Sequence, residues 1–282
     1  MAIKFDNTDI SIINTNLARV RRELSINVKR LSTGYRINSA SDDPSGLAIS
    51  QVFDAQVRSL GQAIRNANDG VSLVQIAEGG LEEISSVLSR MRELAVQSKN
   101  GSLTDSDRAT IDTEYQALKA EIDRISDATE FNGTKLLNTA GTFTFQVGIN
   151  NSTTVNTITV STSDVNTDSI GTTGGSTELF DTTVSTTSKA STAIDSLDVA
   201  IGEINTVRAR MGAAVNRLDY AVSYASSARD TLTQAKSRIK DVDVATETAS
   251  YTRNQILLQA GASLLAQANV VPTIALQILQ GR

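Results

Sequence analysis

The side chains in this sequence that could carry chemistry are of few types. The chain has 26 Lys and Arg residues, 31 Asp and Glu residues and five Tyr residues, and it contains no His, Cys or Trp. This composition excludes imidazole-based catalysis, thiol nucleophiles, disulfides and metal sites of the His/Cys type. Acid–base chemistry by carboxylates, Lys or Tyr is the class that remains.

Two pairs of adjacent carboxylates, Asp42-Asp43 and Glu82-Glu83, are the candidates for such chemistry. Neighbouring residues on a helix point in different directions, so neither pair shares a site, and surface or helix-terminus roles are expected. Gly79-Gly80 has no preceding strand and is therefore not a phosphate-binding loop. We predict that the protein is not an enzyme and that it binds no metal ion or cofactor.

The charge pattern bears on possible partners. A net charge of −5 argues against nucleic-acid binding, which requires an excess of cations. The first 25 residues are interrupted by charges and do not form a secretory signal peptide. Residues 254–281 are uncharged, but amide side chains are scattered through them. That segment fits a buried protein–protein surface better than a membrane span.

Apolar residues recur at three- and four-residue intervals in four stretches, which predicts long helices packed as in coiled coils. The stretches cover residues 10–31, 57–95, 111–125 and 194–239, and Asn27 interrupts the first. Pro44 after two acidic residues predicts a helix start, and a 56-residue helix would reach Lys99. Asn100 or Gly101 could provide a left-handed cap at its end. Thr104 and Asp107 resemble a capping box that starts the next helix.

The middle of the chain has a different pattern. Residues 142–149 alternate between polar and apolar, and Ile158 and Val160 indicate a second strand after a turn at residues 150–152. From Ser152 to Ser188, 20 of 37 residues are Ser or Thr. We interpret this segment as an exposed loop in which residues 171–186 are dispensable. O-linked glycosylation is the alternative reading of the same composition.

The prediction for the fold is mainly α: a long coiled-coil-like helical rod with paired terminal helices and a small β-rich insert. The two terminal segments have apolar faces but no domain of their own. They must therefore pair with each other or with other copies of the chain. Identical subunits packed head to tail along an open screw axis give a filament, so the sequence points to self-assembly.

Several motifs closely resemble the signature sequences of bacterial flagellins. In the first half they are RLSTGYRINSA at residues 30–40, DDPSGLAI at 42–49, RNANDG at 65–70, RELAVQS at 92–98 and FNGTKLL at 131–137. Near the end they are SRIKDVD at 237–243, QIL at 255–257 and AQANVVP at 266–272. The likeness covers about residues 1–150 and 188–282, in the order found in that family.

The resemblance implies a division into five segments. These are an N-terminal inner-tube segment with its connecting turn (1–43), an outer-tube rod in two parts (44–137 and 189–240), a β-hairpin with a variable insert (138–188) and a C-terminal inner-tube segment (241–282). In flagellins the terminal segments are disordered in the monomer and pair in the filament. The resemblance therefore implies an extracellular subunit of the flagellar filament, used for swimming and exported without a cleaved signal peptide.

The resemblance also implies partners and site residues. Copies of the chain itself are the main partner, with a flagellar export chaperone and the cap and hook-junction proteins beside it. Toll-like receptor 5 is a further partner, with a patch at Arg90, Leu94 and Glu114. The turn from Ser39 to Ser45 would connect the inner tube to the rod. The expected assembly seam is Ile10, Ile13, Leu17, Val20, Leu24, Leu31, Leu257, Leu264, Leu265, Val271 and Leu279.

Two alternatives remain at this point. One is a hook–filament junction protein of the same extended family, and the other is an intracellular coiled-coil scaffold. The matches at residues 92–98 and 131–137 favour a flagellin.

Overall fold

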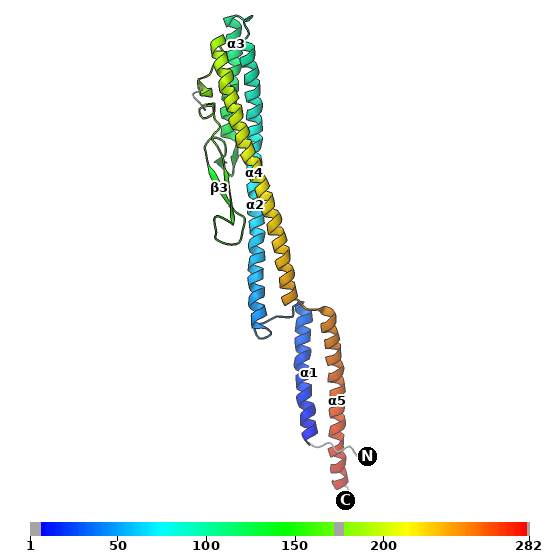
Figure 1. Ribbon diagram of the computed structural model, residues 1–282. Coiled ribbons are helices and arrows are strands. Elements are labelled where there is room, and N and C mark those ends of the chain that lie inside the picture. Colours follow the sequence, from blue (N-terminus) through cyan, green and yellow to red (C-terminus); the bar gives the residue numbers. More distant parts are fainter. Residues whose placement is uncertain (1–6, 172–177, 281–282) are drawn as a thin grey trace. The chain divides into compact units, whose positions relative to one another are not determined.

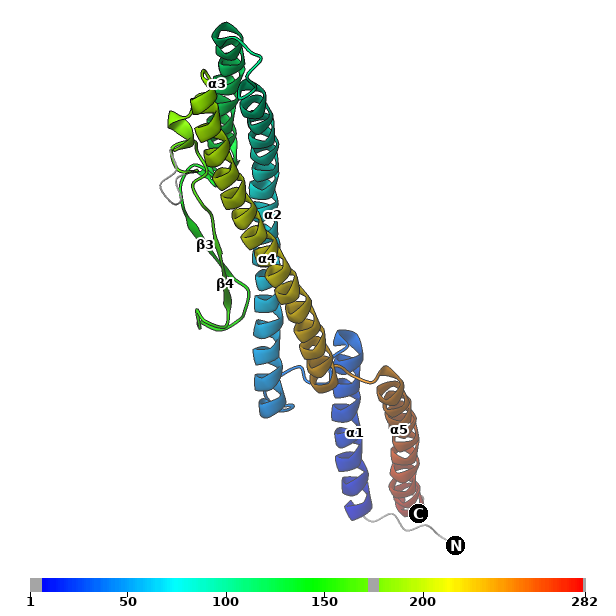
Figure 2. The ribbon, with the colours of Figure 1, turned by 45° about the horizontal axis from the view of Figure 1, so that its top comes forward.

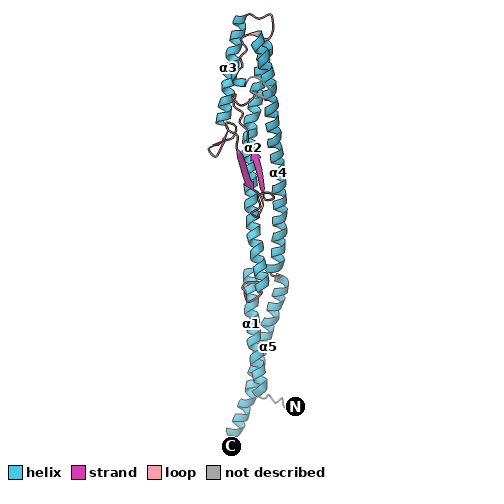
Figure 3. Ribbon diagram, turned by 60° about the vertical axis from the view of Figure 1, so that its left-hand side comes forward, coloured by secondary structure: helices cyan, strands magenta, loops and turns pink. Residues whose placement is uncertain are grey.

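The structure is a computed structural model that describes residues 7–171 and 178–280 (Figure 1). It is mainly α-helical, as the sequence predicts. The helices are α1 (Asn7–Thr33), α2 (Pro44–Ser98), α3 (Asp105–Ala128), α4 (Thr187–Lys240) and α5 (Val244–Gln280). Among the described residues, the strands form two antiparallel pairs (Figure 3). They are β1 (Glu130–Phe131) with β2 (Thr134–Lys135), and β3 (Thr142–Gln146) with β4 (Thr157–Ser161).

The chain folds into two compact units. The terminal unit contains the residues up to Ala55 and those from Thr231 onward, and the central unit runs from Gln56 to Asp230. The boundaries between these two units fall inside α2 and α4. The first turns of α2 and the last turns of α4 therefore belong with α1 and α5.

The central unit has a core shared by three helices. Figures 1 and 2 show α2, α3 and α4 side by side. At Gly80 on α2 the backbone approaches its neighbours closely, because an added Cβ would lie 2.6 Å from the Thr129 hydroxyl oxygen. The fully buried residues of the core that lie on the predicted stripes include Ala77, Leu81, Ile84, Leu88, Met91, Tyr115, Ile122, Leu197, Ile204 and Leu218.

The end of α2 and the start of α3 are fixed by side chains. α2 ends at Ser98, but no left-handed residue follows it at positions 100 or 101, so that part of the prediction is wrong. Instead the buried guanidinium of Arg108 donates to the carbonyl oxygens of Ser98, Asn100 and Leu103. These acceptors include carbonyls that a helix end leaves without partners. The predicted capping box of Thr104 and Asp107 is confirmed.

The hairpin of β3 and β4 packs along α2 (Figures 1 and 3). Its register pairs Phe143 with Val160 and Phe145 with Ile158. The amide of Asn66 on α2 donates to the Gln146 carbonyl at 3.0 Å, and an added Cβ on Gly70 would lie 3.1 Å from the Phe145 ring. Both predicted strands are confirmed, although β3 ends at Gln146.

The Ser/Thr-rich insert is partly buried, which corrects the expectation of an exposed loop. In the segment 178–185, which we call the strap, Leu179 and Val184 are fully buried. The Tyr115 hydroxyl lies 2.7 Å from that of Thr182, and Asp112 accepts a hydrogen bond from the Val184 amide at 2.7 Å. The strap therefore forms part of the core. Residues 172–177 lie outside the described residues.

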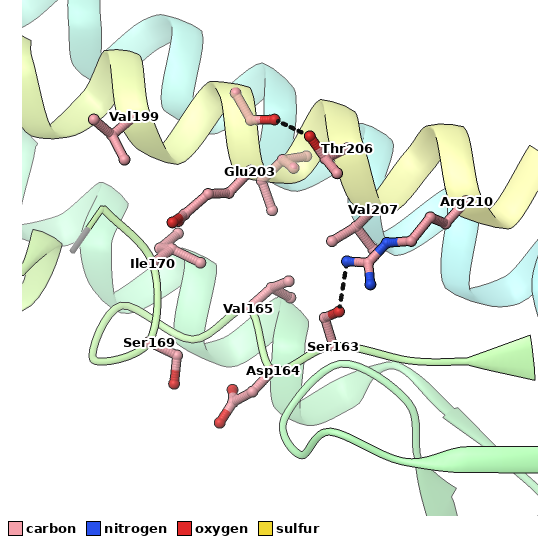
Figure 4. A pocket seen from close by; sticks show the side chains of 12 residues that line it. Ser163, Asp164, Val165, Ser169, Ile170, Val199, Glu203, Thr206, Val207 and Arg210 are labelled. Atoms are coloured by element: carbon pink, nitrogen blue, oxygen red, sulfur yellow. Dashed lines mark hydrogen bonds between the residues drawn. The ribbon is translucent and has the colours of Figure 1, made fainter. Parts of the chain in front are cut away.

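An upstream part of the insert lies against α4 (Figure 4). Val165 and Ile170 are buried, and a cavity of about 460 Å³ separates this loop from Val199 and Val207. Arg210, one of the charged residues that line the cavity, donates a hydrogen bond to the Ser163 hydroxyl at 3.1 Å. The Glu203 carboxylate accepts a hydrogen bond from the Gly171 amide at 2.9 Å. These contacts fasten the insert to the helix.

A pH titration should detect the buried strap. Desolvation raises the pKa of Tyr115 from 10.0 to about 12. The neutral phenol thus contributes stability below pH 10 that is lost as the pH rises towards 12, since the unfolded chain ionises first. Burial lowers the pKa of nearby Lys119. That shift makes stability rise with pH, which is opposite to the effect of Tyr115. The ionisation of the phenol is therefore a better readout than the overall stability. Tyrosinate absorbance at 295 nm should show a step near pH 12 that Tyr115→Phe removes. An unchanged curve in that variant would contradict the burial.

Candidate functional site: the paired terminal helices

α1 and α5 lie side by side in the terminal unit (Figures 1 and 2). Asn27 of α1 contacts Glu247 and Asn254 at the start of α5, whereas Leu17 lies against Gly261 further along. The helices are therefore antiparallel. The sequence prediction that the terminal helices pair is confirmed.

The predicted seam residues differ in their burial. Leu17 and Val20 are buried, and Ile10, Ile13, Leu24, Leu31 and Leu265 are half-buried. Leu257 and Leu264 are 48 % and 55 % exposed, so they lie outside the seam between α1 and α5. The side chains of Val271 and Leu279 lie outside the described residues.

The face of α5 towards α1 carries small and polar residues. Glu247, Asn254 and Ala268 are buried and Gly261 is half-buried, at intervals of seven residues. This spacing is the heptad repeat of a coiled coil, whose inward positions are ordinarily apolar. Among the large apolar side chains of α5, Leu258 and Leu265 are half-buried, whereas Ile256, Leu257 and Leu264 are exposed and point elsewhere.

A buried polar layer joins the two helices. The Asn27 amide nitrogen donates to a Glu247 carboxylate oxygen, and the Asn27 oxygen accepts from the Asn254 amide at 2.9 Å. The second Glu247 oxygen lies 3.7 Å from the guanidinium of Arg30. Asn27, Glu247 and Asn254 are all buried, and each makes at least one hydrogen bond within the layer.

The surface that α1 and α5 leave uncovered carries several large apolar side chains among polar and charged ones. Exposed apolar surface on a helix pair can mark an interaction site. Among the described residues, no helix is long and apolar enough to cross a membrane. The uncovered large side chains on these helices are Ile12, Ile26, Val28, Val244, Ile256, Leu257 and Leu264.

The two connections that flank these helices are joined to each other. Tyr35 and Asp241 form an isolated β-bridge, and the Val242 amide donates to the Gly34 carbonyl at 3.0 Å. The ammonium group of Lys240 lies 4.4 Å from the centre of the Tyr35 ring. The expected turn from Ser39 to Ser45 starts in the first connection and ends in the first turn of α2. In this connection the Asp42 carboxylate accepts hydrogen bonds from the backbone amides of residues 38 and 39, and these hydrogen bonds lower the pKa of Asp42.

The expected receptor patch is only partly at the surface. Arg90 donates to Glu114 at 2.9 and 3.1 Å and to Glu93 at 3.0 Å, and hydrogen bonding to Glu114 raises the pKa of Arg90. Leu94 is only 2 % exposed. This corrects the expectation that Leu94 belongs to a surface patch with Arg90. α2 is covered here by both α3 and α4, so its buried face is wide enough to include Leu94.

The described residues contain no group of three or more His, Cys, Asp or Glu side chains that could hold a metal ion. The carboxylates of Glu82 and Glu83 are exposed on α2. The Asp43 carboxylate accepts a hydrogen bond from the Gly46 amide at the start of that helix. The carboxylate pairs thus occupy surface and helix-terminus positions.

Comparisons with known proteins agree with this architecture. Residues 6–142 match the family model of the bacterial flagellin N-terminal helical region, and residues 194–279 match that of the C-terminal helical region. A flagellin from Halalkalibacterium halodurans is 42 % identical over 279 residues, which cover 95 % of this chain and 100 % of that protein. The flagellar filament 33 kDa core protein of Treponema phagedenis is 42 % identical over 276 residues, which cover 95 % of this chain and 94 % of that protein.

A solved structure from Vibrio parahaemolyticus, described as a flagellar hook-associated protein, shares the fold. Its TM-score is 0.58 at 16 % identity, with 71 % of this chain and 100 % of that chain covered. At this identity the likeness concerns the fold alone. The decisive findings are the matches to the family models at both ends and the relatives that align over nearly the full length. They show that the chain belongs to the bacterial flagellin family, whose members are the structural subunits of the flagellar filament.

Proposed function

We propose that this chain is the repeating subunit of a flagellar filament in which α1 and α5 form the inner part. The observation that carries the proposal is the uncovered apolar surface of these helices, where Ile256 is 59 % exposed. Burying such surface against copies of the same chain stabilises a polymer, since apolar area removed from water contributes about 25 cal/mol per Å². An open helical arrangement repeats that contact without closing a ring.

Purified filaments test the proposal. Filaments sheared from the cells that produce this protein should consist mainly of this chain, and the purified chain should re-form filaments. A junction protein would be a minor component of the sheared material, and an intracellular scaffold would be missing from it. Either of those results would overturn the assignment.

Export is part of the proposal. The chain would leave the cell through the flagellar export route, with its first residues retained because no signal peptide is cleaved. The intact mass of exported protein should equal the mass of the full sequence, and a strain without that route should retain the protein. The same mass measurement decides whether sugars are attached to the insert. A flagellar export chaperone, the cap and the hook-junction proteins are the further partners proposed for this route.

Toll-like receptor 5 contact is proposed only for the charged part of the patch, because Leu94 is buried. The exposed Arg90–Glu114 pair offers a guanidinium held in a fixed orientation, which suits an interface contact. Removing the pair by Arg90→Ala and Glu114→Ala should lower the signal of receptor-expressing reporter cells at least tenfold. Leu94→Met, which conserves the core, serves as the control. Equal signals from all three proteins would contradict receptor contact at this patch.

A further inference from the structure

The polar layer between α1 and α5 is unusual for a helix pair that only needs to associate. A layer of leucines at Asn27, Glu247 and Asn254 would bury more apolar surface without any polar group to satisfy. Buried polar residues at inward positions of a coiled coil lower stability and specify one alignment, since the groups find partners in that alignment only. The layer therefore points to alignment as its role.

A second feature, ten residues from Asn27 along α1, favours the same alignment of α5 against α1. Leu17 fits against Gly261, where an added Cβ would lie 2.6 Å from a methyl carbon of Leu17. A side chain at that position would require Leu17 to move. The next inward residue of α5, one heptad further on, is Ala268, which does carry that Cβ.

The heptad spacing of α5 defines the competing alignment. If α5 moved by seven residues towards its own start, Asn254 would take the place of Glu247, Gly261 that of Asn254, and Ala268 that of Gly261. Asn27 would then lose its carboxylate acceptor and the donor to its own oxygen, and Leu17 would meet the methyl group of Ala268. The opposite movement is limited by the bridge between Tyr35 and Asp241, because no spare chain separates it from α5.

We propose that the polar layer of Asn27, Glu247 and Asn254, together with the contact of Leu17 with Gly261, fixes the axial register of α5 against α1. The register decides how the outward residues of α5, such as Leu257 and Leu264, are placed beside those of α1, such as Ile26. A shift of one heptad would displace the two halves of this surface by about 10 Å, at 1.5 Å per residue. Such a surface no longer matches that of an unshifted copy. The proposal rests on the proposed function in that the composite surface is the one that binds other copies.

Spin labels can measure the register directly, since the chain has no Cys of its own. The parent protein carries Ser32→Cys and Ala262→Cys, both exposed positions. Ala262 adjoins Gly261 and is thus nearly level with Leu17, whereas Ser32 lies fifteen residues further along α1. A slide of one heptad should therefore shorten the separation of the labels by about 10 Å. Labelled chains are polymerised with a twenty-fold excess of unlabelled wild-type chains, so that electron–electron double resonance reads distances within one chain.

The test variant adds Asn27→Leu and Gly261→Ala to the parent. Asn27→Leu leaves Glu247 and Asn254 buried without their partner, and Gly261→Ala makes positions 261 and 268 alike. We expect a single narrow distance in the parent and a population about 10 Å shorter in the variant, or exclusion of the variant from filaments. The matched control adds Asn16→Leu and Gly202→Ala, which are the same substitutions at exposed positions with open space. It should behave as the parent does.

The outcomes separate the register from the function. A variant that enters filaments with the distance of the parent would overturn the register assignment. A control that shifts as the variant does would also overturn it, because the effect would then not be specific to the layer. Failure of the wild-type chain to form filaments would contradict the proposed function instead, and the same labels would then be read in the soluble chain against the same criteria.

Discussion

Removal of residues 1–31 and 254–282 is expected to abolish polymerisation and to leave a soluble helical monomer. The truncated protein lacks most of α1 and α5 and therefore most of the apolar surface that we propose binds other copies. It retains the core of the central unit, whose buried residues lie between Ala67 and Leu218. Sedimentation and electron microscopy should show no filaments at concentrations where the full chain assembles completely. Circular dichroism should still show high helix content.

The control for this truncation is a deletion in the central unit. Residues 150–154 form an exposed turn between β3 and β4, so their removal should leave polymerisation intact. Filaments formed by the protein without its terminal segments would contradict the assignment of α1 and α5 to assembly. Loss of assembly in the control would mean that the hairpin turn also contacts other copies.

Leu179→Ala is expected to lower the free energy of unfolding of the central unit by about 2–4 kcal/mol, in the range of Leu-to-Ala changes in cores. Leu179 is 0 % exposed and packs in the same core as α2, α3 and α4. The neighbouring Phe180 is 56 % exposed and lies 5.4 Å from the Lys119 ammonium group. Phe180→Ala should therefore cost less than about 1 kcal/mol.

Urea unfolding of both variants, followed by circular dichroism, compares these two costs. Equal effects would mean that the strap is held by its backbone contacts alone. A negligible effect of Leu179→Ala would restore the interpretation of the segment as a dispensable loop. The outcome also bears on the deletion of residues 171–186, which the burial of Leu179 and Val184 now predicts to be destabilising.

The helices were predictable because their signals are local. The capping box of Thr104 and Asp107 depends on residues three apart, and the apolar stripes recur every three or four residues. The strap was not predictable in this way. Leu179 and Val184 are isolated apolar residues in a Ser/Thr-rich segment, and their burial depends on Tyr115 and Asp112 of a distant helix. No periodic pattern carries that information.

The candidate site was predictable only where its signals are local in the sequence. Asn27 was visible as the interruption of an apolar stripe, but its partner Glu247 lies 220 residues away and cannot be found by spacing. The division of α5 into an inward and an outward face was also hidden, since both faces lack charge after Asn254. Arg108 was hidden as the cap of α2, because a long side chain replaced the expected left-handed residue.

The pairing of α1 with α5 has a consequence for the order of folding. The two helices come from opposite ends of the chain, and forming their contacts closes a loop of more than 200 residues. Contacts of such long sequence separation form slowly, since the entropy of closing the loop is lost before the contacts form. The central unit closes shorter loops and can fold first. A nascent chain on the ribosome carries α1 without its partner until the last residues are translated. The paired surface therefore cannot form before synthesis ends, so an incomplete chain lacks it.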